Sequence, residues 1–153
     1  MKGDGEAAQW LVEALSRAGF PRAEVWDTEG HPAVHACWPA ADPEAPVLLV
    51  YSHHDVHAVE PPAWQVSDPF SPLLSDGRLH GRGASDAKGQ VMSHLWALRT
   101  HLARRTAPAV TVKYLIEGEE EIGSGRVRSL PPGRRDSPSP SDSGHGPPSR
   151  SPG

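Results

Sequence analysis

The chain has 153 residues, a formal charge of −4, 17 prolines and 15 glycines. Its length fits one modest domain, and its slightly acidic balance argues against a protein held on nucleic acid by phosphate contacts. The N-terminus lacks the apolar core of a signal peptide, no apolar run is long enough to cross a membrane, and the single cysteine, Cys37, cannot form an internal disulfide. These features predict a soluble, cytoplasmic protein with neither nucleic acid nor membrane as a partner.

The first predicted element is an amphipathic helix that ends before Gly19, a residue type common at helix C-termini. Its apolar residues recur at helical spacing: Ala8, Leu11, Val12, Leu15 and Ala18. Two short apolar runs, 46–51 and 110–116, are typical of buried strands. Between them, apolar residues spaced by four, three and four predict a helix over about 87–105. This order indicates an α/β domain with a mostly parallel sheet.

The last 28 residues, 126–153, have a different composition from the rest. They contain seven prolines, seven serines and a charge of +3, with Val127 and Leu130 as their apolar side chains. Such a segment cannot bury enough surface to offset the entropy of ordering it. We therefore expect a folded region over 1–125 and a disordered tail over 126–153, and we interpret the tail as a product of frameshift or truncation rather than as a native basic tail.

Polar side chains follow the first strand directly. His53, Asp55 and His57 alternate there, so they project to one side if the strand continues. Imidazole suits zinc, and a carboxylate two residues away can bind the ion or fix the tautomer of the ring. The alternative is that these are ordinary polar loop residues.

Asp86 stands at the end of a glycine-containing turn, just before the second predicted helix. Aspartate is a favoured N-cap residue, so capping alone could explain it. A dinucleotide-binding fingerprint is excluded because Asp86 occupies the place of its third glycine, and no nucleotide cofactor is expected.

The second strand runs into a third cluster, which holds Glu117, Glu119, Glu120 and Glu121. A run of charges is usually a solvated loop, but carboxylates this close repel one another unless a cation compensates them. In open α/β sheets, ligands bind beyond the carboxyl ends of the strands. We therefore expect His53, Asp86 and the glutamate cluster to converge, and His31, His35, His94 and His101 to lie elsewhere.

Three segments resemble the catalytic domain of the M20 family of dinuclear zinc peptidases, especially its carnosinase-like dipeptidases. They are YSHHDV, PAWQVSDPFSPLLSDGRLHGRGASDAKG and IEGEEEIGS, and the resemblance covers roughly residues 9–125. It implies an N-terminal part of a three-layer α/β catalytic domain that binds two Zn²⁺ ions. The implied activity is hydrolysis of an amide bond in a small peptide or acyl-amino acid by a metal-activated water.

The resemblance also implies a role for each site residue. His53 would bind one zinc, Asp86 would bridge both, and Glu121 would bind the other. Asp55 would orient His53, and Glu120 would be the general base. Glu117 and Glu119 are expected to be solvated or to support the site from behind.

The sequence departs from the family pattern in its last part. A late aspartate and a late histidine complete the family's metal site, and Asp142 and His145 lie in a proline-rich context that does not suit either role. The lid domain through which relatives often dimerise is also missing, so dimerisation is not expected from the resemblance. The sheet would be left with an apolar edge strand. The chain is therefore expected to be weakly active or inactive alone, and the alternative is a non-catalytic metal-binding or interaction fragment.

Overall fold

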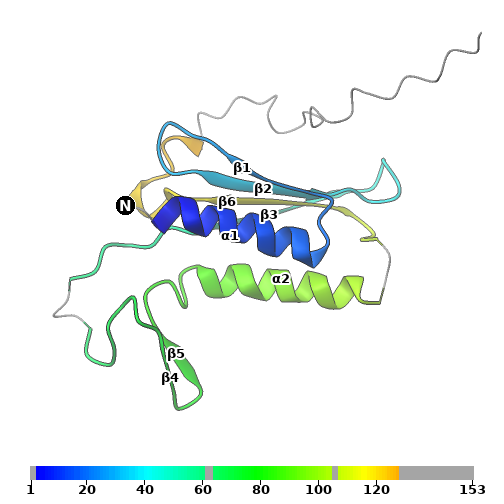
Figure 1. Ribbon diagram of the computed structural model, residues 1–153. Helices are drawn as coiled ribbons and strands as arrows, with labels where there is room; N and C mark the ends of the chain where they lie inside the picture. Colours follow the sequence, from blue (N-terminus) through cyan, green and yellow to red (C-terminus); the bar gives the residue numbers. More distant parts are fainter. Residues whose placement is uncertain (1–2, 61–63, 105–106, 128–153) are drawn as a thin grey trace, which may run out of the picture.

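The computed structural model describes residues 3–60, 64–104 and 107–127. In these ranges a four-stranded sheet is covered by two helices, and a two-stranded hairpin lies beside them (Figure 1). Among the described residues, no helix is long and apolar enough to span a bilayer. The elements in chain order are α1 (Gly3–Ala18), β1 (Arg22–Trp26), β2 (Ala33–Trp38), β3 (Val47–His53), β4 (Leu73–Ser75), β5 (Arg78–His80), α2 (Lys88–Leu102), β6 (Thr111–Glu117) and the 3₁₀ turn η2 (Glu120–Ile122).

The main sheet has the strand order β1-β2-β6-β3. Strands β3 and β6, which the sequence predicted, are parallel neighbours, with His53 opposite Glu117. The pairs β1/β2 and β2/β6 are antiparallel. The α/β class is therefore confirmed, and the parallel pairing holds at the strands that carry the candidate site. The sheet as a whole is mixed because β1 and β2 form a hairpin, and a short connection pairs strands antiparallel.

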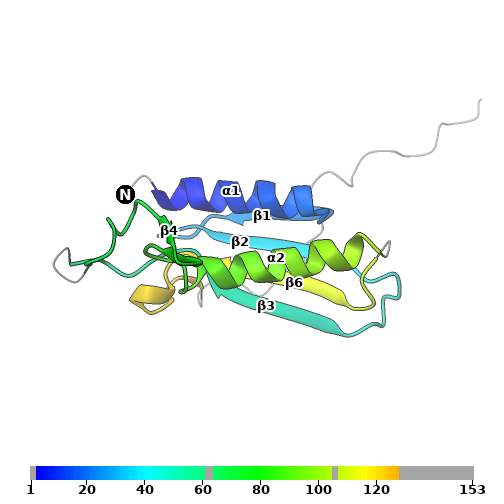
Figure 2. The same cartoon turned by 90° about the horizontal axis from the view of Figure 1, so that it is seen from below.

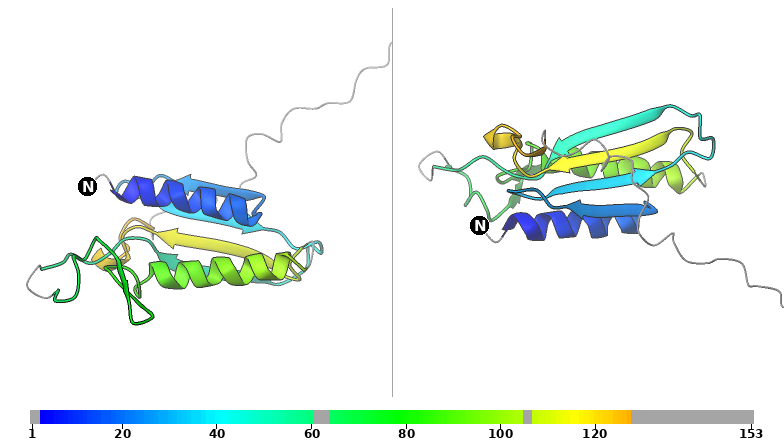
Figure 3. Two further views of the ribbon diagram at one scale, coloured as in Figure 1. Left: turned by 60° about the horizontal axis from the view of Figure 1, so that its bottom comes forward. Right: turned by 90° about the horizontal axis from the view of Figure 1, so that it is seen from above.

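Both helices lie side by side on one face of the sheet (Figure 2). Leu11 and Leu15 of α1 pack with Val91 of α2 and with Val34 and Ile116 of the sheet. The opposite face carries no helix in the described part of the chain (Figure 3). The apolar core therefore lies between the sheet and the helix layer, as expected for an amphipathic helix on a sheet.

The predicted end of the first helix is confirmed. Gly19 has a φ of 104°, a left-handed conformation that glycine adopts without strain. A Cβ at this position would also lie 2.9 Å from the Trp38 ring. The chain can therefore leave α1 and turn directly into β1.

The segment that follows η2 stays in contact with the folded region. Arg126 forms an ion pair with Glu119 at 3.0 Å, and Val127 packs against Trp26 and Ala33. The composition had assigned these two residues to the disordered tail. Because both make contacts with the folded region, the packed region extends at least to Val127. The predicted disorder of 128–153 lies outside the described residues.

Candidate metal centre

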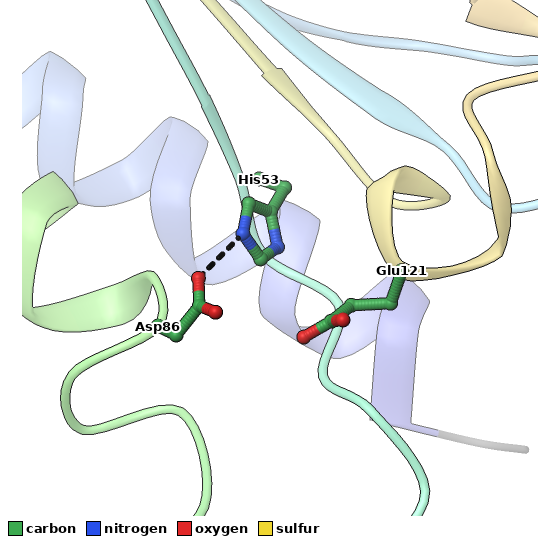
Figure 4. A group of neighbouring side chains, drawn as sticks. All are labelled: His53, Asp86 and Glu121. Atoms are coloured by element: carbon green, nitrogen blue, oxygen red, sulfur yellow. Dashed lines mark hydrogen bonds and ion pairs between the residues drawn. The ribbon is translucent and has the colours of Figure 1, made fainter.

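Three predicted ligands meet at one end of the sheet. His53 ends β3, Asp86 precedes α2, and Glu121 lies in η2 just after β6. One ligand atom from each lies within 4.8 Å of the others (Figure 4). The parallel strands β3 and β6 bring their carboxyl ends to the same edge, and α2 begins there, which explains the convergence. One imidazole and two carboxylates in reach of a common point form a donor set that suits Zn²⁺.

Asp86 does not cap the helix that follows it. The N-cap residue of α2 is Ala87, and no side chain makes a capping hydrogen bond there. Instead, Asp86 Oδ1 lies 3.0 Å from His53 Nε2, and the Asp86 side chain is 72% exposed. The capping explanation for this aspartate is therefore wrong, and its carboxylate is available to a ligand.

Asp55 touches two of the converging residues. Nδ1 of His53 lies 3.2 Å from the Asp55 carbonyl oxygen and 3.3 Å from its Oδ1. Asp55 Oδ2 accepts a hydrogen bond of 3.0 Å from the backbone N–H of Glu121. Because Nδ1 of His53 contacts Asp55, Nε2 of the same ring faces Asp86. In metal sites, an outer group that holds one nitrogen of a histidine in this way directs the other nitrogen toward the ion.

Glu120 and Glu121 both face the cluster because the chain has left the strand. Strand β6 ends at Glu117, and the two glutamates lie in the 3₁₀ turn η2. Glu120 Oε2 lies 3.8 Å from His53 Nε2. In a strand, consecutive side chains would point to opposite faces. In the 3₁₀ turn both side chains can face the same way, and the exposed carboxylate of Glu120 lies next to the proposed metal ligands.

The other histidines are placed differently. His57 is on the rim, where its backbone N–H donates to Glu121 Oε1 at 3.1 Å and its Nδ1 lies 3.7 Å from Glu121 Oε2. The group of converging ligands does not include His31, His35, His94 or His101. Asp142 and His145, the two weak candidates from the tail, lie outside the described residues.

The charge around His53 favours a cation. Burial lowers the pKa of His53, but its hydrogen bond to Asp86 and the charges of Asp55 and Glu120 raise it by more, so the net pKa lies above the ordinary 6.5. Several carboxylates around one ring require a positive charge for compensation, which either a proton on His53 or a metal ion can supply.

Glu117 and Glu119, which were expected either to be solvated or to support the site from behind, are buried, so the solvated alternative is wrong. Their side chains are 0% and 1% exposed. Glu117 accepts a hydrogen bond from the Tyr51 hydroxyl, and Glu119 binds Arg126 and the backbone of His31. Sequence reasoning missed these partners because they come from distant segments. The sequence did contain one signal: carboxylates this close together repel one another, so some of them were to be expected in paired, buried positions.

Comparison with known proteins places the chain in a family. Residues 49–140, more than half of the chain, match the sequence pattern of peptidase family M20/M25/M40. A cysteinylglycine-S-conjugate dipeptidase of Corynebacterium striatum is 37% identical over an alignment of 125 positions, and the match covers 77% of this chain and 26% of that protein. A beta-Ala-His dipeptidase of Mus musculus is 37% identical over 90 residues, or 59% of this chain and 18% of that protein.

A solved structure shows the same fold. The M20 family metallo-carboxypeptidase Sso-CP2 from Sulfolobus solfataricus matches with a TM-score of 0.74 and 38% identity, over 83% of this chain and 28% of that one. The chain thus spans less than a third of the length of these relatives.

Proposed function

Because the chain belongs to peptidase family M20/M25/M40, we propose that it serves zinc-dependent hydrolysis of amide bonds in small peptides or acyl-amino acids. The observation that supports this most is the approach of His53, Asp86 and Glu121 to within 4.8 Å of one another. The similar proteins from C. striatum and M. musculus are both dipeptidases. Dipeptides are therefore the first substrates to test.

Each residue of the cluster has a proposed task. His53, Asp86 and Glu121 would hold zinc, with Asp86 as the bridge to a second ion, and Asp55 would keep Nε2 of His53 directed at the site. Bound zinc would acidify a water and polarise the carbonyl of the scissile amide. Oε2 of Glu120 lies 3.8 Å from Nε2 of His53, and the Glu120 side chain is 44% exposed. Its carboxylate would take the proton of the attacking water and pass it to the leaving amine.

We further propose that the chain alone binds zinc without measurable turnover. Three protein ligands suffice for one catalytic zinc, whereas a second ion needs further ligands. The Asp86 and Glu120 side chains are 72% and 44% exposed, so water is not excluded where the substrate would react. This openness favours the alternative, a non-catalytic metal-binding or interaction fragment, for the chain by itself.

Zinc titration by calorimetry tests the site. His53→Ala removes the most buried ligand, so we expect zinc binding to weaken at least about tenfold. His94→Ala removes an exposed histidine of α2 and serves as the matched control, with binding unchanged. Equal zinc affinity in the wild type and His53→Ala would contradict the proposed metal centre.

Peptide assays test the chemistry. The zinc-loaded chain is incubated with cysteinylglycine and with β-alanylhistidine, with and without a chelator, and the free amino acids are measured. We expect zinc binding with no cleavage above background. Cleavage that disappears with the chelator and in Glu120→Gln, but not in the exposed control Glu44→Gln, would establish an enzyme and overturn the expected inactivity.

A further inference from the structure

We propose that Glu119 is a positioning residue, which fixes the η2 turn and thereby sets where Glu120 and Glu121 stand. The inference rests on the proposed function in that Glu121 is taken as a metal ligand. The loop that joins β1 to β2 contacts the residue that precedes η2, since the backbone N–H of His31 donates a hydrogen bond to the side chain of Glu119. Glu119 connects this loop to the turn through that hydrogen bond.

The Glu119 side chain connects segments that are far apart in the sequence. It is 1% exposed, and its Oε1 accepts hydrogen bonds from the His31 backbone N–H at 3.2 Å and from Arg126 Nη1 at 3.0 Å. A buried carboxylate is costly unless it is paired, so these contacts determine where it can lie. Glu119 therefore holds the start of the turn against the β1–β2 loop on one side and against Arg126 on the other.

The main chain of the same residue shapes the turn itself. The carbonyl oxygen of Glu119 accepts hydrogen bonds from the backbone N–H groups of Ile122 at 3.2 Å and Ser124 at 2.8 Å. The two proposed functional glutamates lie between these bonded positions. A shift of Glu119 therefore moves the turn that carries them, including the bond from the Glu121 N–H to Asp55.

Gly30 leaves the space that the Glu119 carboxylate occupies. A Cβ at Gly30 would lie 2.0 Å from Oε1 of Glu119 and 2.7 Å from Cδ of Arg126. Real Cβ atoms do not approach so closely, so alanine at this position requires a shift of the loop or of the Glu119 and Arg126 side chains, which alters the fit between them. The β1–β2 loop therefore fits against the turn because Gly30 has no side chain and because the Glu119 carboxylate is buried beside it.

Two readouts test the inference in the full chain. The first is hydrogen exchange of the Glu121 backbone amide, followed by NMR in metal-free protein. The second is zinc affinity. In Glu119→Gln we expect faster exchange at Glu121 and zinc binding about tenfold weaker, within the range for residues that orient metal ligands. Glu29→Gln makes the same chemical change at an exposed position of the adjoining loop, and should alter neither.

Gly30→Ala disturbs the contacts of the Glu119 side chain by a change in the β1–β2 loop rather than in Glu119 itself. We expect it to reproduce both effects of Glu119→Gln, whereas Gly125→Ala, which adds a methyl group with nothing within 4 Å, should have none. In a Glu119→Ala background, Gly30→Ala should have a smaller effect than it has alone, because the carboxylate is gone and the remaining close contact is with the flexible side chain of Arg126. Should Glu119→Gln fail to fold, Arg126→Gln alters the half-exposed partner and should give smaller changes in the same direction.

The outcomes separate the inference from the function. Unchanged Glu121 exchange in folded Glu119→Gln and Gly30→Ala, or an additional full effect of Gly30→Ala without the Glu119 side chain, would overturn the positioning role. If the wild type binds no zinc, the proposed function fails, and the exchange data still decide whether Glu119 positions the turn.

Discussion

Asp55 links two of the proposed metal ligands through both of its carboxylate oxygens. Oδ1 lies 3.3 Å from His53 Nδ1, and Oδ2 accepts the N–H of Glu121. The first contact places a carboxylate charge beside the imidazole, whose Nδ1 also lies 3.2 Å from the Asp55 carbonyl oxygen, and the second holds the ligand-bearing turn. Because Asp55 itself is not expected to touch the ion, its effect on the metal is indirect.

Asp55→Asn is expected to weaken zinc binding about 10- to 100-fold without abolishing it, as for other groups that orient metal ligands. The amide keeps the shape but loses the charge beside His53. Calorimetric titration of the variant measures the change. Asp42→Asn, an exposed aspartate that accepts the N–H of Glu44, is the control. An affinity equal to that of the wild type would show that the Asp55 carboxylate does not orient His53, because the variant keeps the backbone carbonyl that also lies near Nδ1.

The β1–β2 hairpin buries a histidine that takes no part in the metal cluster. The His35 ring stacks on Trp26 with centroids 4.3 Å apart, and Glu24 lies 3.7 Å from its Nδ1. Burial lowers the pKa of His35 below the ordinary 6.5 by more than the charge of Glu24 raises it. The hairpin is therefore packed around a neutral imidazole.

This packing makes the hairpin sensitive to acid. Above about pH 6.5, His35 is neutral in both states and stability does not depend on its titration. As the pH falls below 6.5, the unfolded chain takes up the proton first, so the free energy of unfolding decreases until the pH passes the folded-state pKa. His35→Gln is expected to remove this loss.

Urea unfolding of metal-free protein between about pH 8 and about pH 5 measures the difference between the wild type and His35→Gln. The exposed control His94→Gln should keep the wild-type slope. Identical pH profiles for the wild type and His35→Gln would contradict a lowered pKa at His35.

At the scale of the whole molecule, β3 is an edge strand of the described sheet and is paired with β6 alone. Four of its apolar side chains are more than half exposed: Val47, Leu48, Leu49 and Tyr51. The strand contains no lysine or proline that would block further pairing. Such an edge favours association with another strand.

Leu49→Lys is expected to reduce self-association of the chain, because a charge on an edge strand opposes pairing. Sedimentation velocity over a range of concentrations would show a shift towards monomer relative to the wild type. Leu74→Lys places the same charge on an exposed leucine of β4, which is outside the main sheet, and should leave association unchanged. A wild-type chain that is monomeric at all concentrations would contradict the prediction.

Periodicity predicted the elements with regular patterns, and missed the short ones. The ends of α1, α2, β3 and β6 lie within a few residues of their predicted positions, except for the start of α1. The runs 22–26 and 33–38 have mixed polarity, with a histidine and a cysteine in the latter, so they did not read as strands. They form because β2 pairs with β1 on one edge and β6 on the other and packs Val34 and Ala36 against α1, contacts that local sequence does not reveal.

The sequence by itself determined the chemical groups and their order: an imidazole after one strand, a carboxylate before a helix, and a run of glutamates after another strand. Parallel strands separated by a helix bring such groups to one edge, so their meeting follows from chain order. Tertiary structure alone decided which glutamates face the cluster and which are buried. That choice depends on the 3₁₀ turn after β6 and on Gly30, His31 and Arg126, whose contacts with Glu119 join segments far apart in the chain.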